Sequence, residues 1–243
     1  VTLVVDQTTE AYTPMTPITV NAEDNSKVAP TLAVTGLPTG LSFDPTTKQI
    51  TGTPTTVGTS TVTVSATDGS TNVGTSTFNI VVTPNKALEA LKAAVADAKT
   101  VNKNDYTPNS VAALDAKLTE AEALIAHPEN GSTDQFNAKT QEVKQAKDQL
   151  VRKADKTDLE KAIAEASKYT NLDPTKPMDQ QLITALANAK NTDTDQNATQ
   201  KAVDDSKNSL NNAIQEKLRA DAYEKLQQAV MRGVQVAKTD GYT

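Results

Sequence analysis

The feature that most constrains this 243-residue chain is an internal repeat with helical spacing. Four small or apolar residues, three and four positions apart, return 68 positions later and again 67 positions after that. The three sets are Leu91, Ala94, Val95 and Ala98, then Leu159, Ala162, Ile163 and Ala166, then Leu226, Ala229, Val230 and Gly233. A nearly constant interval is typical of an array of small modules. The sequence therefore predicts helical units at 85–155 and 156–218 and the start of a third at 219–243.

Each complete unit is expected to be a three-helix bundle. In the first, residues 86–100 form one helix, and apolar stripes mark two more: Val111, Leu114, Leu118, Ala121 and Ile125, then Phe136, Val143, Ala146 and Leu150. Three amphipathic helices with short links favour up-down-up packing. Neither Pro nor Gly occurs in 148–163 or 211–226. We therefore expect the bundles to share long helices, the last helix of one continuing as the first of the next.

Residues 1–84 have a different period. Apolar side chains occupy every second position in four runs: Ile18 to Ala22, Leu32 to Val34, Val62 to Ala66, and Phe78 to Val82. Turn signals rich in Gly, Pro and Asp separate the runs, which is typical of half-buried antiparallel strands. The predicted fold class is therefore an all-β sandwich followed by tandem all-α bundles.

Composition and charge exclude several classes of function. A net charge of −6 argues against nucleic acid and other polyanions, which need clustered Lys and Arg. Continuous apolar runs are too short for membrane insertion. Cysteine and tryptophan are absent and aromatics are 3% of the chain. The single histidine, His127, precedes Pro128 and has no thiol to activate, and carboxylates lie among lysines on polar faces. We expect no enzymatic activity and no cofactor.

Calcium is the one metal for which the sequence offers ligands. Asp24, Asp44 and Asp68 lie in predicted turns of the sandwich, and hard cations need several converging carboxylates. The alternative is that these residues hydrogen-bond their own turns, which short acidic side chains commonly do. An isopeptide crosslink from Lys27 or Lys48 to Asn79 is a further alternative.

The turn sequences of the sandwich resemble a known family. Leu37, Pro38, Gly40, Leu41, Asp44, Pro45, Gly52, Thr53 and Pro54 stand where the Ig-like family of bacterial surface proteins, related to the cadherin-like domain of dystroglycans, has its hallmark residues. Lys48 replaces the usual glycine, so we expect a different turn there. The acidic calcium motifs of true cadherins are missing. The resemblance implies an Ig/cadherin-like spacer fold.

The helical units resemble FIVAR modules, three-helix repeats of Gram-positive surface proteins. Asp105, Tyr106, Thr107 and Pro108 match the turn after the first helix, and 240–243 match it with one inserted residue. The second unit departs, since Asp173 is followed by Pro174. Tyr106 is expected to pack over the turn of its own bundle. The resemblance implies a cell-wall-anchored, extracellular adhesin with roles in cell adhesion and virulence.

Two functions remain open for what we interpret as a segment of a longer chain. One is a stalk, an elongated monomer that projects a ligand-binding region from the bacterial surface. The other is a binding module for a host extracellular-matrix protein such as fibronectin, or for a host glycan, through a sandwich edge or a helix face. We favour the stalk; an exposed tyrosine cluster around Tyr12 or Tyr106 would favour the binding module instead.

Overall fold

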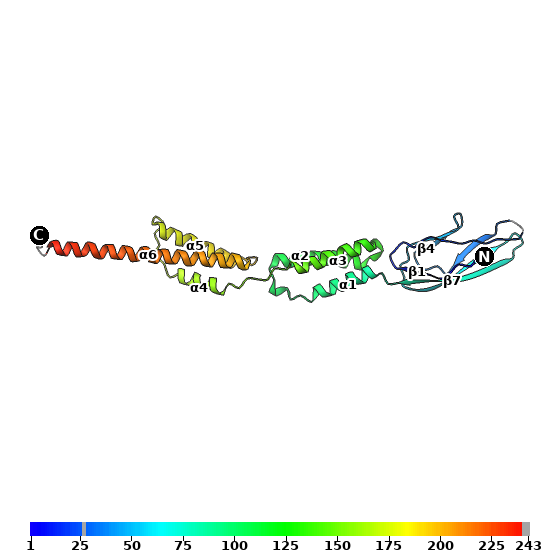
Figure 1. Cartoon of the computed structure of the whole chain (residues 1–243), viewed down its shortest axis with the longest axis horizontal. Helices are drawn as coiled ribbons and strands as arrows, with labels where there is room; N and C mark the ends of the chain where they lie inside the picture. The colour runs from blue at the N-terminus through cyan, green and yellow to red at the C-terminus, as the bar shows by residue number, and fades with distance from the viewer. Residues whose placement is uncertain (26–27, 240–243) are drawn as a thin grey trace. The chain divides into compact units, whose positions relative to one another are not determined.

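A computed structural model describes residues 1–25 and 28–239. A β domain precedes the helices, so the expected fold class is confirmed (Figure 1). The strands are β1 (Gln7–Glu10), β2 (Ile18–Thr19), β3 (Thr31–Thr35), β4 (Leu41–Asp44), β5 (Gln49–Gly52), β6 (Gly58–Thr67) and β7 (Val73–Thr83). The helices are α1 (Lys86–Lys99), α2 (Pro108–Ala126), α3 (Thr133–Asp148), α4 (Thr157–Ala166), α5 (Pro177–Thr194) and α6 (Gln200–Thr239), with short 3₁₀ helices η1 (Lys103–Asp105) and η2 (Pro128–Asn130).

By their internal contacts the residues form two compact units. Of the described residues, the first holds 1–25, 28–101 and 113–149, and the second holds 102–112 and 150–239. None of the described helices combines the length and the apolar character needed to cross a membrane.

The sandwich encloses one core between two sheets. Their strand orders are β1-β7-β6-β3 and β2-β5-β4. The alternating runs of β6 and β7 bury one face each, and Ile18 and Ile50 close the core from the second sheet. Pairing is antiparallel as expected, except that β1 runs parallel to β7. The sequence pattern had not indicated β1, β4 or β5, because these strands are short and alternate weakly.

Two glycines explain the hallmark turn of the sandwich. Gly40 has φ of +95° and Gly52 has φ of +132°. A Cβ on Gly40 would lie 2.0 Å from the carbonyl oxygen of Thr53, and one on Gly52 would lie 2.2 Å from the carbonyl oxygen of Gly40. Only glycine fits backbones this close. Lys48 has φ of +56°, a conformation that glycine adopts most easily, so the expectation of a different turn finds no support.

The first helical bundle contains α1, α2 and α3. Each helix buries the centre of the stripe that the sequence predicts, with Leu91, Leu114 and Phe136 all 0% exposed. Val111, Ile125 and Ala146 are half-buried, and Leu150, predicted on the third helix, lies beyond the end of α3. Lysine–carboxylate pairs link the helices at the surface: Lys117 with Glu142 at 3.0 Å, Lys139 with Glu120 at 2.6 Å, Lys147 with Asp97 at 2.6 Å, and Lys99 with Glu122.

The second bundle contains α4, α5 and the first half of α6, around a core that includes Leu159, Leu182 and Leu210. As predicted, α6 continues unbroken beyond this bundle to Thr239. The same prediction is wrong at the preceding junction, because α3 ends at Asp148 and α4 begins at Thr157. There the backbone of the intervening residues bonds the segment 105–107 instead of continuing the helix.

Candidate functional site

Two of the three candidate calcium ligands, Asp44 and Asp68, accept hydrogen bonds from residues of their own turns. The Asp44 carboxylate accepts hydrogen bonds from the Thr46 backbone N–H at 2.8 Å and the Thr47 hydroxyl at 3.0 Å. Asp68 accepts bonds from the Ser70 and Asn72 backbone N–H groups, both at 2.8 Å, and from the Asn72 amide at 2.9 Å. These bonds favour the charged form and hold the pKa of both carboxyls below its ordinary value, the largest contributions coming from the Thr46 N–H and the Asn72 side chain.

Asp24 and Asp68 line one shallow hollow of about 220 Å³, together with Glu23. Asp44 is not among the residues that line it. Within residues 1–25 and 28–239, no three His, Cys, Asp or Glu side chains converge in a geometry that could hold a metal ion. The structure therefore brings two of the three candidates to one surface without assembling a ligand shell.

The side chains of His127 and Asn79, the other candidate reactive groups, make ordinary contacts with their neighbours. His127 is exposed, and its Nδ1 lies 3.1 Å from Glu129 Oε1. The amide of Asn79 is held by Asp6, with Nδ2 3.4 Å from Asp6 Oδ2, and its Oδ1 accepts from the Thr61 hydroxyl at 3.0 Å. Lys27, a proposed crosslinking partner, lies outside the described residues, as does the predicted turn at 240–243.

A buried asparagine joins the sandwich to the first bundle. Asn85 is 1% exposed, and its Oδ1 accepts from the N–H groups of Ala87 and Leu88 at 3.0 Å, which caps α1. Its Nδ2 contacts the Ala11 carbonyl at 3.1 Å, the Thr13 hydroxyl at 3.2 Å and the Thr133 hydroxyl at 3.1 Å. We call Asn85 and these three partners the first joint. The cap was predicted from sequence, whereas the three other contacts were not.

The Asp-Tyr-Thr-Pro turn of the first helical repeat forms a second joint with the link after α3. Tyr106 forms a β-bridge with Arg152, whose guanidinium carbon lies 5.5 Å from the centre of the tyrosine ring. The Thr107 N–H donates to the Val151 carbonyl at 2.8 Å, and the Ser110 hydroxyl oxygen accepts from the Val151 N–H at 3.1 Å. These five residues, Tyr106, Thr107, Ser110, Val151 and Arg152, define the second joint.

The second joint also contacts the loop between α5 and α6 of the second bundle. The Asn109 backbone N–H donates to Asn197 Oδ1, between α5 and α6, at 2.9 Å. Residues 102–112 accordingly belong to the second compact unit, although they lie within the first repeat in sequence. Tyr106, expected to pack over the turn of its own bundle, also pairs with Arg152 of the link after α3. Tyr12 and Tyr106 are each half-buried, so neither belongs to an exposed aromatic cluster.

The two-sheet domain and the two helical bundles, consecutive in sequence, define a tandem array of an Ig-like module and three-helix modules. The sequence model described as "FIVAR domain" matches residues 87–151 and 155–217. Because these matches cover more than half of the chain, the protein belongs to the FIVAR domain family. The model described as "Putative Ig domain" matches residues 1–83.

Curated relatives and solved structures are similar over parts of the chain. The "Serine-rich adhesin for platelets" of Staphylococcus aureus strain MRSA252 is 52% identical over 46 residues, which is 19% of this chain and 3% of that protein. Its counterpart in strain USA300 matches equally over 2% of its length, so the chain spans only a small part of these relatives. The N-terminal domain of group B Streptococcus alpha C protein aligns with a TM-score of 0.26 at 14% identity, covering 48% of this chain and 62% of that one.

Proposed function

We propose that this chain is a non-catalytic spacer segment of an extracellular, cell-wall-anchored bacterial adhesin, which projects a ligand-binding region away from the surface. The tandem modules and the similarity to a staphylococcal adhesin support this role. The observation that carries it is the bonding of the first joint, where the buried Asn85 amide contacts Ala11, Thr13 and Thr133 in place of a free linker between the sandwich and the first bundle. A spacer that positions a distant ligand-binding region needs such joints, because an unbonded linker leaves its ends free to reorient.

The surface chemistry supports a role without catalysis or a resident metal. The carboxylates that have perturbed pKa values are engaged by lysines or by their own turns, as Glu120 is by Lys139 and Asp44 is by Thr46. Structural ion pairs and turn hydrogen bonds account for these shifts without a catalytic cleft. The spacer proposal therefore includes the absence of enzymatic activity and of any required cofactor.

Binding assays test the proposal. The purified chain is passed over immobilised fibronectin, other matrix proteins, platelet surface proteins and glycans at physiological salt. The spacer role predicts no saturable binding. Saturable binding to any member of the panel would contradict it.

A second candidate is a host-binding module, favoured by one observation: the relative is named as an adhesin for platelets. On the sandwich, the open edge of β3 (Thr31–Thr35) is a strand to which an extended peptide could pair. If the chain binds, Thr31→Lys and Ala33→Lys should weaken binding, because lysines on an edge disfavour strand addition. Equal binding by these variants would exclude the edge.

A further inference from the structure

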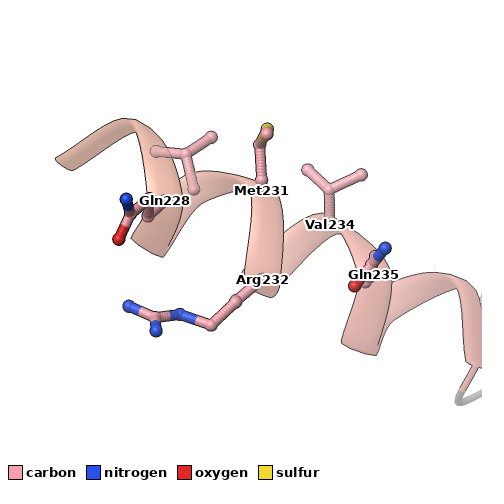
Figure 2. Close-up of a pocket in the computed structure, with 6 residues that line it drawn as sticks. Gln228, Met231, Arg232, Val234 and Gln235 are labelled. Atoms are coloured by element: carbon pink, nitrogen blue, oxygen red, sulfur yellow. The ribbon is translucent and has the colours of Figure 1, made fainter. Parts of the chain in front are cut away.

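The second half of α6 carries an apolar stripe that is open to solvent. Tyr223, Leu226, Val230 and Val234, three and four residues apart, are 63%, 62%, 56% and 51% exposed. Figure 2 shows Met231 and Val234 projecting to one side of the helix and Arg232 to the other. The hollow beside them, about 540 Å³, is lined by residues of α6 alone. A contiguous apolar stripe of this kind marks an interaction surface, unlike scattered single exposures.

The internal repeat identifies what such a stripe packs against. Positions 223, 226, 230 and 233 correspond to Leu88, Leu91, Val95 and Ala98 of α1, each 135 positions earlier. In α1 these four side chains are 4%, 0%, 6% and 0% exposed, inside the first bundle. The corresponding Leu159 and Ala166 of α4 are also 0% exposed, packed with α5 and α6. Positions 226 and 233 are therefore exposed here and buried in both complete repeats, whereas the second-repeat counterparts of 223 and 230, Lys156 and Ile163, are half-buried.

Ion pairs anchor the start of this open segment to the second bundle. Lys217, which bonds Asp221 of the same helix at 2.6 Å, also bonds Asp179 of α5 at 2.7 Å, and Lys176, just before α5, pairs with Glu224 at 3.3 Å. Within the described part of the chain, residues 225–239 of this helix form no ion pair. The segment is thus held at its base and presents its stripe along its remaining length.

We infer that residues 219–239 are the first helix of a third bundle, and that the stripe docks an antiparallel pair of amphipathic helices of the same polypeptide, with the apolar spacing of α2 and α3. Charge adds a specific requirement. Arg232 stands at the position of Asp97, which pairs with Lys147 of α3 at 2.6 Å. The third helix of the new bundle therefore presents a carboxylate opposite Arg232. This inference does not depend on the spacer role.

An extension of the chain tests the inference by supplying the pair. A copy of residues 108–150 is appended after Thr243, with the Lys147 position of the copy changed to Glu. Hydrogen exchange should then slow by about tenfold or more at amides 223–239, relative to the 243-residue chain. A matched extension in which the copied Leu114 and Leu118 positions are Asp should give no protection. Equal exchange in the extended and unextended chains would overturn the inference.

The 243-residue chain without the extension tests whether a second copy of the chain covers the apolar stripe instead. Sedimentation of the 243-residue chain should show a monomer, and Val230→Asp should leave its melting temperature unchanged because the side chain is exposed. A dimer that Val230→Asp dissociates would assign the stripe to self-association and overturn the inference. Neither result bears on binding to host ligands, so the spacer role is tested separately.

Discussion

Asp179 of α5 and Lys217 of α6 form an enclosed ion pair, with Oδ1 and Nζ 2.7 Å apart and side chains only 4% and 12% exposed. Asp179 also accepts the Asp173 backbone N–H at 2.8 Å. Because Lys217 reaches Asp221 as well, the pair joins the turn before α5 to the point where α6 leaves the second bundle. One carboxylate thus fixes both a loop and a long helix.

This pair should make the second bundle sensitive to acid. Lys217 first, and then the Asp173 N–H, lower the pKa of Asp179 below its ordinary 3.8. A depressed carboxyl pKa contributes stability that is present above the ordinary value and lost as pH falls through the folded value. Asp179→Asn should therefore lower the free energy of unfolding by about 2 kcal/mol at neutral pH and flatten its decline below about pH 4.

Urea unfolding between pH 2.5 and 7, about the range where carboxylates titrate, measures the effect of Asp179→Asn. The control is Glu120→Gln, which removes the exposed ion pair between Glu120 and Lys139 and should change the pH profile less than Asp179→Asn does. A pH profile of Asp179→Asn parallel to that of the unchanged chain would show that the pair has no linkage to folding. The raised pKa of Lys217 contributes stability that is lost only above its ordinary 10.5, outside this range.

The first joint predicts a graded response at Asn85. Asn85→Ala removes both the cap of α1 and the bonds to Ala11, Thr13 and Thr133, and should cost about 2–3 kcal/mol. Asn85→Ser keeps a cap acceptor and loses only the Nδ2 donors, so it should cost about half as much. Chemical denaturation of the three proteins checks the order. Equal losses for Ala and Ser would mean that the cap contributes little.

Backbone strain predicts opposite results at two turn positions. Lys48→Gly relieves a left-handed conformation that costs a non-glycine residue about 1–2 kcal/mol, partly offset by the greater freedom of glycine in the unfolded chain. The sandwich should gain up to about 1 kcal/mol. Gly40→Ala places a Cβ against the Thr53 carbonyl and should destabilise strongly. Calorimetry that shows Lys48→Gly to be destabilising would contradict the strain argument.

Calcium should leave the sandwich unchanged. The carboxylates of Asp44 and Asp68 are engaged by their own turns, and among the described residues no three acidic side chains converge to hold a metal ion, although Glu23, Asp24 and Asp68 line one hollow. Thermal unfolding with millimolar calcium or with a chelator should therefore give the same melting temperature. A rise with calcium that Asp68→Asn abolishes would reverse this conclusion.

Periodicity was sufficient to predict most elements but not their joints. The alternating runs at 62–66 and 78–82 and the repeated stripes located β6, β7 and the helices, because burial of one face imposes its period on the sequence. The break at 149–156 left no such signal. It has no Pro or Gly, and it is fixed by bonds from Val151 and Lys153 to residues far earlier in the chain.

The first joint shows the same limit. A cap at Asn85 follows from its place before an apolar helical run. The Nδ2 of Asn85 also contacts Ala11, Thr13 and Thr133. These contacts depend on how distant segments pack together, which no local sequence pattern encodes. Tyr106 likewise carried a recognisable motif, while its partner Arg152 carried none.

The most direct test of a spacer with bonded joints is a distance distribution across the first joint. Because the chain lacks cysteine, Thr75→Cys in β7 and Gln141→Cys in α3, both exposed, give unique spin-label sites. Pulsed electron resonance should show one narrow distance peak that Asn85→Ala broadens. A broad distribution in the otherwise unchanged chain would mean that the sandwich and bundle reorient freely, and would contradict the account.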